Sequence, residues 1–95
     1  MRKYETLFVL RANTDEESRA ALIAKFTGII NNDGEVTKVD EWGTKKLAYE
    51  IKKVNEGYYV LVDFKASTDL PLELERNFRI SDDVLRYVVI NKEEK

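Results

Sequence analysis

The first apolar stretch of the chain alternates with the two-residue period of a β-strand. Residues 3–10 are rich in aromatic and apolar side chains, which favours a strand. One side of this strand would carry Tyr4, Thr6, Phe8 and Leu10, and the other side Glu5, Leu7 and Val9. A final strand of the same kind is predicted over residues 84–91.

Two segments show the longer period of a helix. In the first, apolar residues recur at helical spacing up to residue 32, namely Leu22, Phe26, Ile29 and Ile30. Thr14 followed by Glu17 is a capping box that would begin this helix, and Gly34 would end it in a left-handed conformation. The second helix is predicted over residues 70–80, with an N-cap among residues 67–69 and a buried face of Leu70, Leu74 and Phe78.

Residues 36–51 and 58–66 predict two more strands, and the segment 54–57 between them predicts the turn of a hairpin. Gly43 predicts a bulge in the first of these strands. The order of elements is then β-α-β-β-α-β, the ferredoxin-like arrangement of the α+β class. Right-handed crossovers would place both helices on one face of a four-stranded antiparallel sheet with strand order 4-1-3-2. We expect one domain over residues 1–95, with residues 92–95 as a loose tail.

The sheet face that points away from the helices carries many apolar side chains. If Phe8 faces the helices, Leu7 and Val9 point away from them, and Tyr59 and Leu61 do the same in the strand 58–66. The last strand is ambiguous, because its inward set is either Leu85, Tyr87 and Val89 or Arg86, Val88 and Ile90. An exposed apolar patch of this kind marks a partner surface, whereas a few scattered exposed apolar side chains are normal. The sequence leaves both interpretations open.

The charge balance argues mildly against a protein that binds nucleic acid alone. The 95 residues include 18 acidic and 16 basic side chains, which gives a net charge of −2. A solitary nucleic-acid binder is normally basic. RNA binding would therefore need a local basic patch or a basic partner.

The chain offers few side chains for catalysis or metal binding. It contains no histidine and no cysteine, so the usual general base at neutral pH, a thiolate zinc site and a disulfide framework are missing. The acidic clusters at residues 15–17 and 82–83 suit helix capping and solvation better than a metal ion. We expect no cofactor and no enzyme activity. The first apolar run covers only residues 7–10, which is too short for a signal peptide or a membrane span, so the cytoplasm is the expected compartment.

Two other functions use the same topology. An RNA-recognition-motif module binds single-stranded RNA alone, and Gly57-Tyr58 matches the start of its aromatic motif, but Glu56, Tyr59 and Val60 depart from that motif. An acylphosphatase-like enzyme would use Arg11 and an anion-binding loop, but residues 11–14 contain no glycine. The first function stays open as an alternative, and the second is disfavoured.

One segment is more specific than any of these patterns. Residues 42–52, Trp-Gly-Thr-Lys-Lys-Leu-Ala-Tyr-Glu-Ile-Lys, closely resemble the second-strand signature of the bacterial small-subunit ribosomal protein S-six family. Residues 1–5, 57–59, 74–76 and 84–87 resemble the same family in the same order, so the resemblance covers essentially the whole chain.

The resemblance implies a structural constituent of the small ribosomal subunit. Members of this family bind the central domain of small-subunit ribosomal RNA in a heterodimer with ribosomal protein S-eighteen during platform assembly. Carried over to this sequence, the RNA contacts fall on Arg2, Lys3, Tyr4, Arg86, Lys53 and Lys92. The surface for the protein partner falls on Trp42, Leu47, Tyr49, Tyr59 and Leu61. Alternatives stay open, because Tyr4, Trp42 and Tyr49 would serve equally as core aromatics and the lysines as solvated charges.

Overall fold

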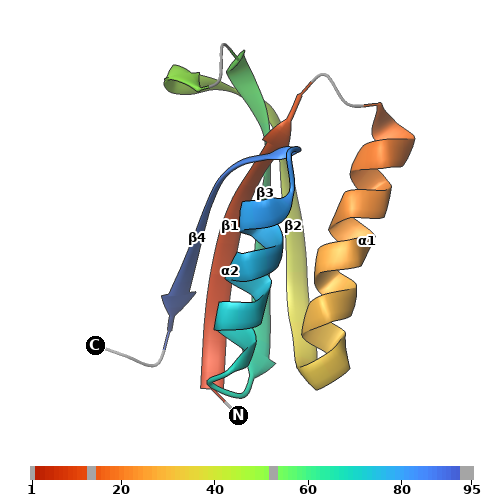
Figure 1. Cartoon of the computed structure of the whole chain (residues 1–95), viewed down its shortest axis with the longest axis vertical. Helices are drawn as coiled ribbons and strands as arrows, with labels where there is room; N and C mark the ends of the chain where they lie inside the picture. Colours follow the sequence, from red (N-terminus) through yellow and green to blue (C-terminus); the bar gives the residue numbers. More distant parts are fainter. Residues whose placement is uncertain (1, 13–14, 52–53, 93–95) are drawn as a thin grey trace.

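The computed structural model describes residues 2–12, 15–51 and 54–92 of the chain. The elements along the chain are β1 (Arg2–Arg11), α1 (Glu16–Asp33), β2 (Gly34–Ile51), β3 (Val54–Ala66), α2 (Leu70–Ile80) and β4 (Val84–Asn91). The strands form one antiparallel sheet in the order β2-β3-β1-β4, and both helices cover the same face of it (Figure 1). This arrangement confirms the ferredoxin-like fold and the predicted strand order.

The core lies between the helices and the inner face of the sheet. The ring of Phe8 in β1 meets the rings of Phe26 in α1 and Phe78 in α2, with centroid separations of 5.3 and 5.0 Å. The two helical rings are themselves 4.7 Å apart, and all three side chains are fully buried. The apolar positions that the sequence assigned to the inner side of β1 and to both helices are therefore the ones that hold the layers together.

In β4 the side chains that face the helices are those of the first predicted set, Leu85, Tyr87 and Val89, with one change at the start of the strand. Tyr87 and Val89 pack against the core, whereas Arg86, Val88 and Ile90 are exposed. The pairing of β1 with β4 shifts between Val9 and Leu10, so that Leu10 lies opposite Val84. Because of this irregularity, Val84 is the buried side chain at the start of β4, and Leu85 is only partly buried.

The ends of α1 differ from the prediction. Its N-cap is Asp15, whose carboxylate accepts a hydrogen bond from the Ser18 backbone N–H at 2.9 Å, so the cap is not Thr14, which lies outside the described residues. Gly34 follows the helix with an extended φ of −164°, so the predicted left-handed cap is wrong. A Cβ atom at Gly34 would lie 2.3 Å from the Lys65 carbonyl oxygen. The glycine is required by this close approach of backbones and not by its φ angle.

The start of α2 also lacks the side-chain cap that the sequence predicted. Its N-cap residue is Asp69, and the Asp69 side chain makes no capping hydrogen bond. The Ser67 hydroxyl donates instead to Asp33 at the end of α1, over 3.1 Å.

The β2–β3 hairpin is longer than predicted. Residues 54–57, predicted as a turn, belong to β3, and the connection at 52–53 lies outside the described residues. β3 pairs with β1 only from Gly57 onward, so the tip of the hairpin projects beyond the rest of the sheet (Figure 1). The predicted bulge is confirmed, because the pairing shifts between Glu41 and Gly43 and Gly43 has a φ of +90°. Two further shifts, between Val36 and Lys38 and between Lys46 and Ile51, were not predicted.

Candidate protein and RNA interface

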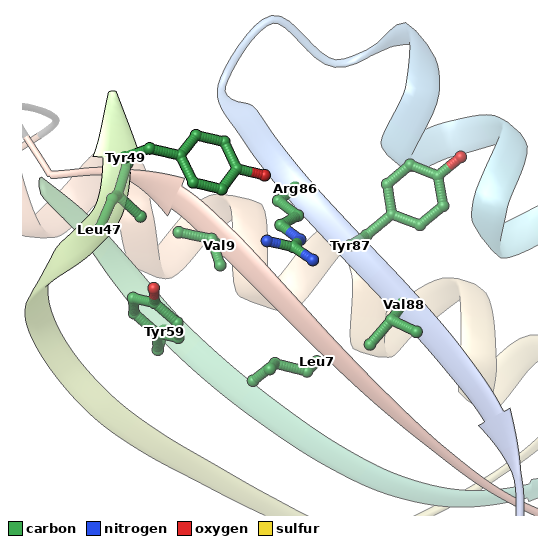
Figure 2. Close-up of a pocket in the computed structure, with 8 residues that line it drawn as sticks. All are labelled: Leu7, Val9, Leu47, Tyr49, Tyr59, Arg86, Tyr87 and Val88. Carbon is green, nitrogen blue, oxygen red and sulfur yellow. The ribbon is translucent and has the colours of Figure 1, made fainter. Parts of the chain in front are cut away.

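The face of the sheet that points away from the helices, here called the outer face, contains an apolar hollow of about 330 Å³ (Figure 2). This outer hollow lies at the end of the sheet from which the hairpin projects, and Figure 2 shows its side chains drawn from all four strands. Its apolar lining includes Leu7, Val9, Leu47, Tyr49, Tyr59 and Val88.

The floor of the outer hollow depends on a glycine. A Cβ atom at Gly57 would lie 2.3 Å from Val9 Cγ1 and 3.4 Å from Leu47 Cδ2. Val9 and Leu47 therefore close over the bare backbone of Gly57, which is why Val9 is only 3% exposed although it points away from the main core. The curl of the hairpin brings Leu47 to this position and gives the outer face a small apolar layer of its own.

An aromatic stack borders the outer hollow on the side of β2. The rings of Trp42 and Tyr59 lie nearly parallel with centroids 6.2 Å apart, and the Lys45 ammonium lies 5.3 Å from the centre of the Trp42 ring. The shift in pairing beside Gly43 places Trp42 on this face, where it remains 42% exposed. Trp42 is therefore not part of the helix-side core, and Tyr49 is more exposed still, at 62%.

The structure brings all five predicted partner residues to the same face. Three of them, Leu47, Tyr49 and Tyr59, line the outer hollow, and Trp42 stacks on Tyr59. Leu61 lies directly opposite Leu7, which extends the apolar surface toward the middle of the sheet. The sequence prediction missed Val88 and Ile90, whose side chains are 44% and 47% exposed on β4; the alternation of β4 contained that signal but could not assign its faces.

The predicted RNA contacts fall into two separate groups. Arg2 and Lys3 are exposed at the start of β1, and Lys92 is beside them because its backbone N–H donates to the Lys3 carbonyl oxygen at 2.9 Å. Arg86 instead pairs with Val9, and Figure 2 shows its side chain extending from β4 toward Val9. The two groups are about 20 Å apart along β1 at roughly 3.3 Å per residue. Lys53 lies outside the described residues.

Tyr4 has the position of a core aromatic. It is 6% exposed, and its ring stacks on Phe64 with centroids 5.5 Å apart. A base could stack on this ring only if Tyr4 left the core. The structure thus favours the alternative in which Tyr4 anchors the start of β1.

Two side chains that other functions would need are engaged elsewhere. Tyr58 faces the helices, where its hydroxyl donates to the Glu41 carboxylate at 2.6 Å and the Arg19 guanidinium lies 4.1 Å from its ring centre. The hydrogen bond to Glu41 raises the pKa of Tyr58 above its ordinary value. Arg11 Nε donates to the Asp82 carbonyl oxygen at 2.9 Å. Tyr58 is therefore not presented to the outer face, and Arg11 is held against the Asp82 backbone.

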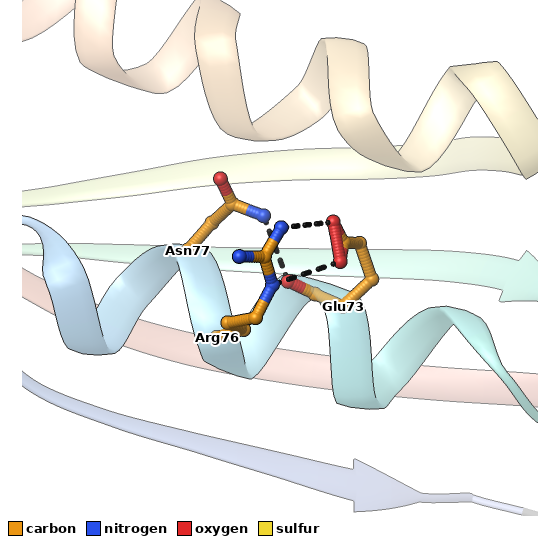
Figure 3. A network of polar contacts seen from close by, with 3 residues as sticks. All are labelled: Glu73, Arg76 and Asn77. Carbon is orange, nitrogen blue, oxygen red and sulfur yellow. Dashed lines mark hydrogen bonds and ion pairs between the residues drawn. The ribbon is translucent and has the colours of Figure 1, made fainter.

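The two arginines of α2 also differ from each other. Arg76 forms an ion pair with Glu73, three residues earlier, at 2.9 Å, next to Asn77, whose side chain donates to the Glu73 carbonyl oxygen (Figure 3). The hydrogen bond from Arg76 lowers the pKa of Glu73. No ion pair joins Glu75 to Arg79 among the described residues. Arg76 thus has the structural role that helical spacing predicts.

Neither a metal nor a membrane-spanning site emerges from the described part of the chain. Its Asp and Glu side chains form no group of three or more that could hold a metal ion. None of its helices is long and apolar enough to cross a membrane.

Comparisons with known proteins agree with this arrangement. The family model described as ribosomal protein S6 matches residues 3–91. The small ribosomal subunit protein bS6 of Alkaliphilus oremlandii is 53% identical over 93 residues, covering 98% of this chain and 99% of the relative. The protein of the same name from Clostridium novyi is 58% identical over 94 residues, covering 98% of this chain and 99% of the relative.

The fold has a close solved counterpart as well. The crystal structure of 30S ribosomal protein S6 from Thermotoga maritima superposes with a TM-score of 0.91 at 34% identity, covering 96% of this chain and 87% of that chain. With a family model over nearly the whole length and relatives above 50% identity, the chain belongs to the ribosomal protein S6 family.

Proposed function

We propose that this chain enters the platform of the small ribosomal subunit as one half of a heterodimer with ribosomal protein S-eighteen, and that the pair binds the central domain of ribosomal RNA. Membership in the family makes the chain a protein of the small ribosomal subunit, which in bacteria is a cytoplasmic particle. The RNA domain and the protein partner are the parts of the proposal that need a test.

The outer hollow is the observation that supports a protein partner. An antiparallel sheet with a solvated outer face normally presents polar side chains there. Here Leu7 and Leu61 face each other across β1 and β3, and the hollow beside them is lined by Leu47 and Tyr59. Covering such a surface with a partner removes apolar area from water, which is the main favourable contribution to protein association.

The charges explain why the partner would matter for RNA binding. The chain has a net charge of −2, so it supplies little of the phosphate neutralisation that dominates affinity for RNA. A basic partner on the outer face would add the missing positive charge next to Arg86. Arg2, Lys3, Lys53 and Lys92 complete the proposed RNA contacts, and Tyr4 contributes by fixing the start of β1.

A solitary RNA-recognition module is the second candidate, and the structure offers it little support. Such a module stacks bases on aromatic rings of its two central strands. On the outer face of β1 the corresponding side chains are Leu7 and Val9, and on β3 the Tyr59 ring is already stacked on Trp42. Tyr58, whose substitution would test that module, faces the helices.

Filter retention of a central-domain RNA fragment, with and without purified S-eighteen and across a salt series, tests the proposal. We expect tight retention only with both proteins, weakened by salt and by Arg2→Ala or Arg86→Ala. Lys25→Ala is the matched control, because Lys25 is an exposed charge on α1. Equal retention by this chain alone would support the solitary module, and absence of retention with both proteins would refute the proposal.

A further inference from the structure

The outer face ends in a row of three lysines at the ends of three neighbouring strands, β3, β1 and β4, opposite the end from which the hairpin projects. Lys3 of β1 lies directly opposite Lys65 of β3. The backbone N–H of Lys92, just beyond the end of β4, donates to the Lys3 carbonyl oxygen at 2.9 Å, so Lys92 continues the row on the other side. Tyr4 and Phe64, which neighbour Lys3 and Lys65 in sequence, are buried against the helices, so the lysines point to the outer face. All three lysines line one hollow of about 330 Å³.

The charges in this lysine row are only partly balanced. Among the described residues, neither Lys3 nor Lys65 forms an ion pair, although Glu35 lies opposite Lys65 on β2. Like charges directly opposite each other on neighbouring strands destabilise a sheet. An anion between these two ammonium groups would remove that repulsion.

Lys92 is held near the row by two acidic side chains. Its ammonium lies 3.6 Å from Asp63 Oδ1 and 3.9 Å from Glu5 Oε1. Both distances exceed the roughly 2.7–2.9 Å of a charge-assisted hydrogen bond. Asp63 Oδ1 is buried and accepts no hydrogen bond in the described structure. Both ion pairs are longer than a hydrogen-bonded pair, so the Lys92 ammonium keeps N–H donors for an anion that binds beside it.

We propose that Lys3, Lys65 and Lys92 together bind one phosphate group of an RNA backbone, which makes Lys65 an RNA contact that the sequence analysis did not identify. The inference rests on the proposed function in taking RNA as the ligand. Each ammonium group is a compact charge with three donors, and a phosphate group accepts hydrogen bonds from several donors at once. The row lies about 20 Å along β1 from Val9, so a partner seated in the outer hollow need not cover it.

The first test measures Lys65→Ala in the filter assay with S-eighteen present. Complete loss of one phosphate contact lowers the slope of log K against log salt by about 0.9 for a duplex, which amounts to about eightfold weaker binding at 0.1 M salt. Because Lys3 and Lys92 remain in Lys65→Ala, we expect weaker binding by up to this amount. The matched control is again Lys25→Ala on α1, for which we expect unchanged binding. If Lys65→Ala binds as tightly as Lys25→Ala while the unaltered pair still binds RNA, the lysine row is refuted and the proposed function stands.

A second variant predicts the opposite sign. Asp63→Asn removes the nearer acidic partner of Lys92 with little change of shape, so it frees Lys92 for the phosphate group. We expect tighter RNA binding and a steeper salt dependence than in the unaltered protein. Unchanged or weaker binding would contradict the role given to Lys92.

A third measurement separates this inference from the proposed function. Pyrophosphate is titrated into the isolated chain, and backbone amide shifts are followed by NMR. We expect saturable shifts at Lys3, Lys65 and Lys92 that are lost in Lys65→Ala, with none at Lys25. If the heterodimer binds no RNA, the proposed function fails, and this titration still decides whether the row binds phosphate. Shifts spread evenly over all exposed lysines would overturn it.

Discussion

Gly57 offers a quantitative test of how the outer hollow is built. Its φ angle is not left-handed, so alanine can adopt the same backbone without strain. The added Cβ atom would lie 2.3 Å from Val9 Cγ1, and Val9 is only 3% exposed, so it has little room to move away. Gly57→Ala therefore changes one thing, namely the space available to Val9 and, at 3.4 Å, to Leu47.

The expected free-energy change follows from two opposing contributions. Overpacking by one carbon atom destabilises a well-packed site by about 1–3 kcal/mol. Loss of the flexibility of glycine in the unfolded chain offsets about 0.4–1 kcal/mol of this. We therefore expect Gly57→Ala to lower the free energy of unfolding by about 0.5–2 kcal/mol. Val9→Ala should lower it by about 1.5 kcal/mol, because two buried carbon atoms are lost at about 0.8 kcal/mol each.

The double variant then distinguishes a local clash from a general effect of the substitution. In Gly57→Ala with Val9→Ala, the new Cβ fills space that Val9 has vacated, so the double variant should be at least about 1 kcal/mol more stable than additivity predicts. Urea unfolding followed by the fluorescence of Trp42, the one tryptophan of the chain, measures all four proteins. Additivity within about 0.3 kcal/mol would refute the packing of Val9 over Gly57.

Two further predictions concern α1 and its two ends. In Gly28→Ala, inside α1, the new Cβ meets no atom within 4 Å, so the free energy of unfolding should rise by about 0.5–1 kcal/mol. In Gly34→Ala the new Cβ would lie 2.3 Å from the Lys65 carbonyl oxygen, so the free energy of unfolding should fall by more than about 1 kcal/mol. Urea unfolding of both variants checks the two signs. Asp15→Asn should destabilise the protein at neutral pH, because hydrogen bonds from Ser18 hold the pKa of Asp15 below its usual 3.8 in the folded state. That stabilisation is present above the unfolded pKa and is lost as pH falls through the lowered folded pKa, so unfolding curves of the two proteins should converge below pH 3.8 and not above it.

The sequence was a reliable guide where one short segment determines the outcome. The alternation of residues 3–10 assigned Phe8 to the core, and the spacing of Leu74 and Phe78 assigned the buried face of α2 correctly. These assignments depend on the period of the element alone, since one face of each element must be covered.

The sequence failed where the outcome depends on how strands are aligned. The faces of β4 could not be assigned, because the shift beside Leu10 decides that Val84 is buried and Leu85 is not. The true roles of two glycines were hidden for the same reason. Gly34 and Gly57 are needed because a distant backbone or side chain approaches them, and no local pattern contains that information.

The candidate site shows the same difference between features of a single strand and features that depend on how two strands are aligned. The five residues predicted for the partner surface do share one face of the sheet, since the strand period shows which aromatic and apolar side chains point outward. The proposed contact Lys65 could not be named from the sequence, because its place opposite Lys3 depends on the alignment of β1 with β3. The resemblance implied that Tyr4 contacts RNA. Its ring instead stacks on Phe64 in the core, the position that the alternation of β1 also allowed.

The layout of the outer face also bears on how an acidic protein can take part in RNA binding. Its apolar hollow, lined by Leu7 and Val9, and its lysine row lie roughly 13–20 Å apart along β1 on one sheet. A partner bound at the hollow and a phosphate group bound at the row would therefore be held at a fixed separation. Fixing two weak contacts on one scaffold reduces the entropy lost when the second contact forms, so each raises the affinity of the other without touching it. A chain with a net charge of −2 thus needs a well-placed local row of positive charge and a partner more than it needs a basic surface overall.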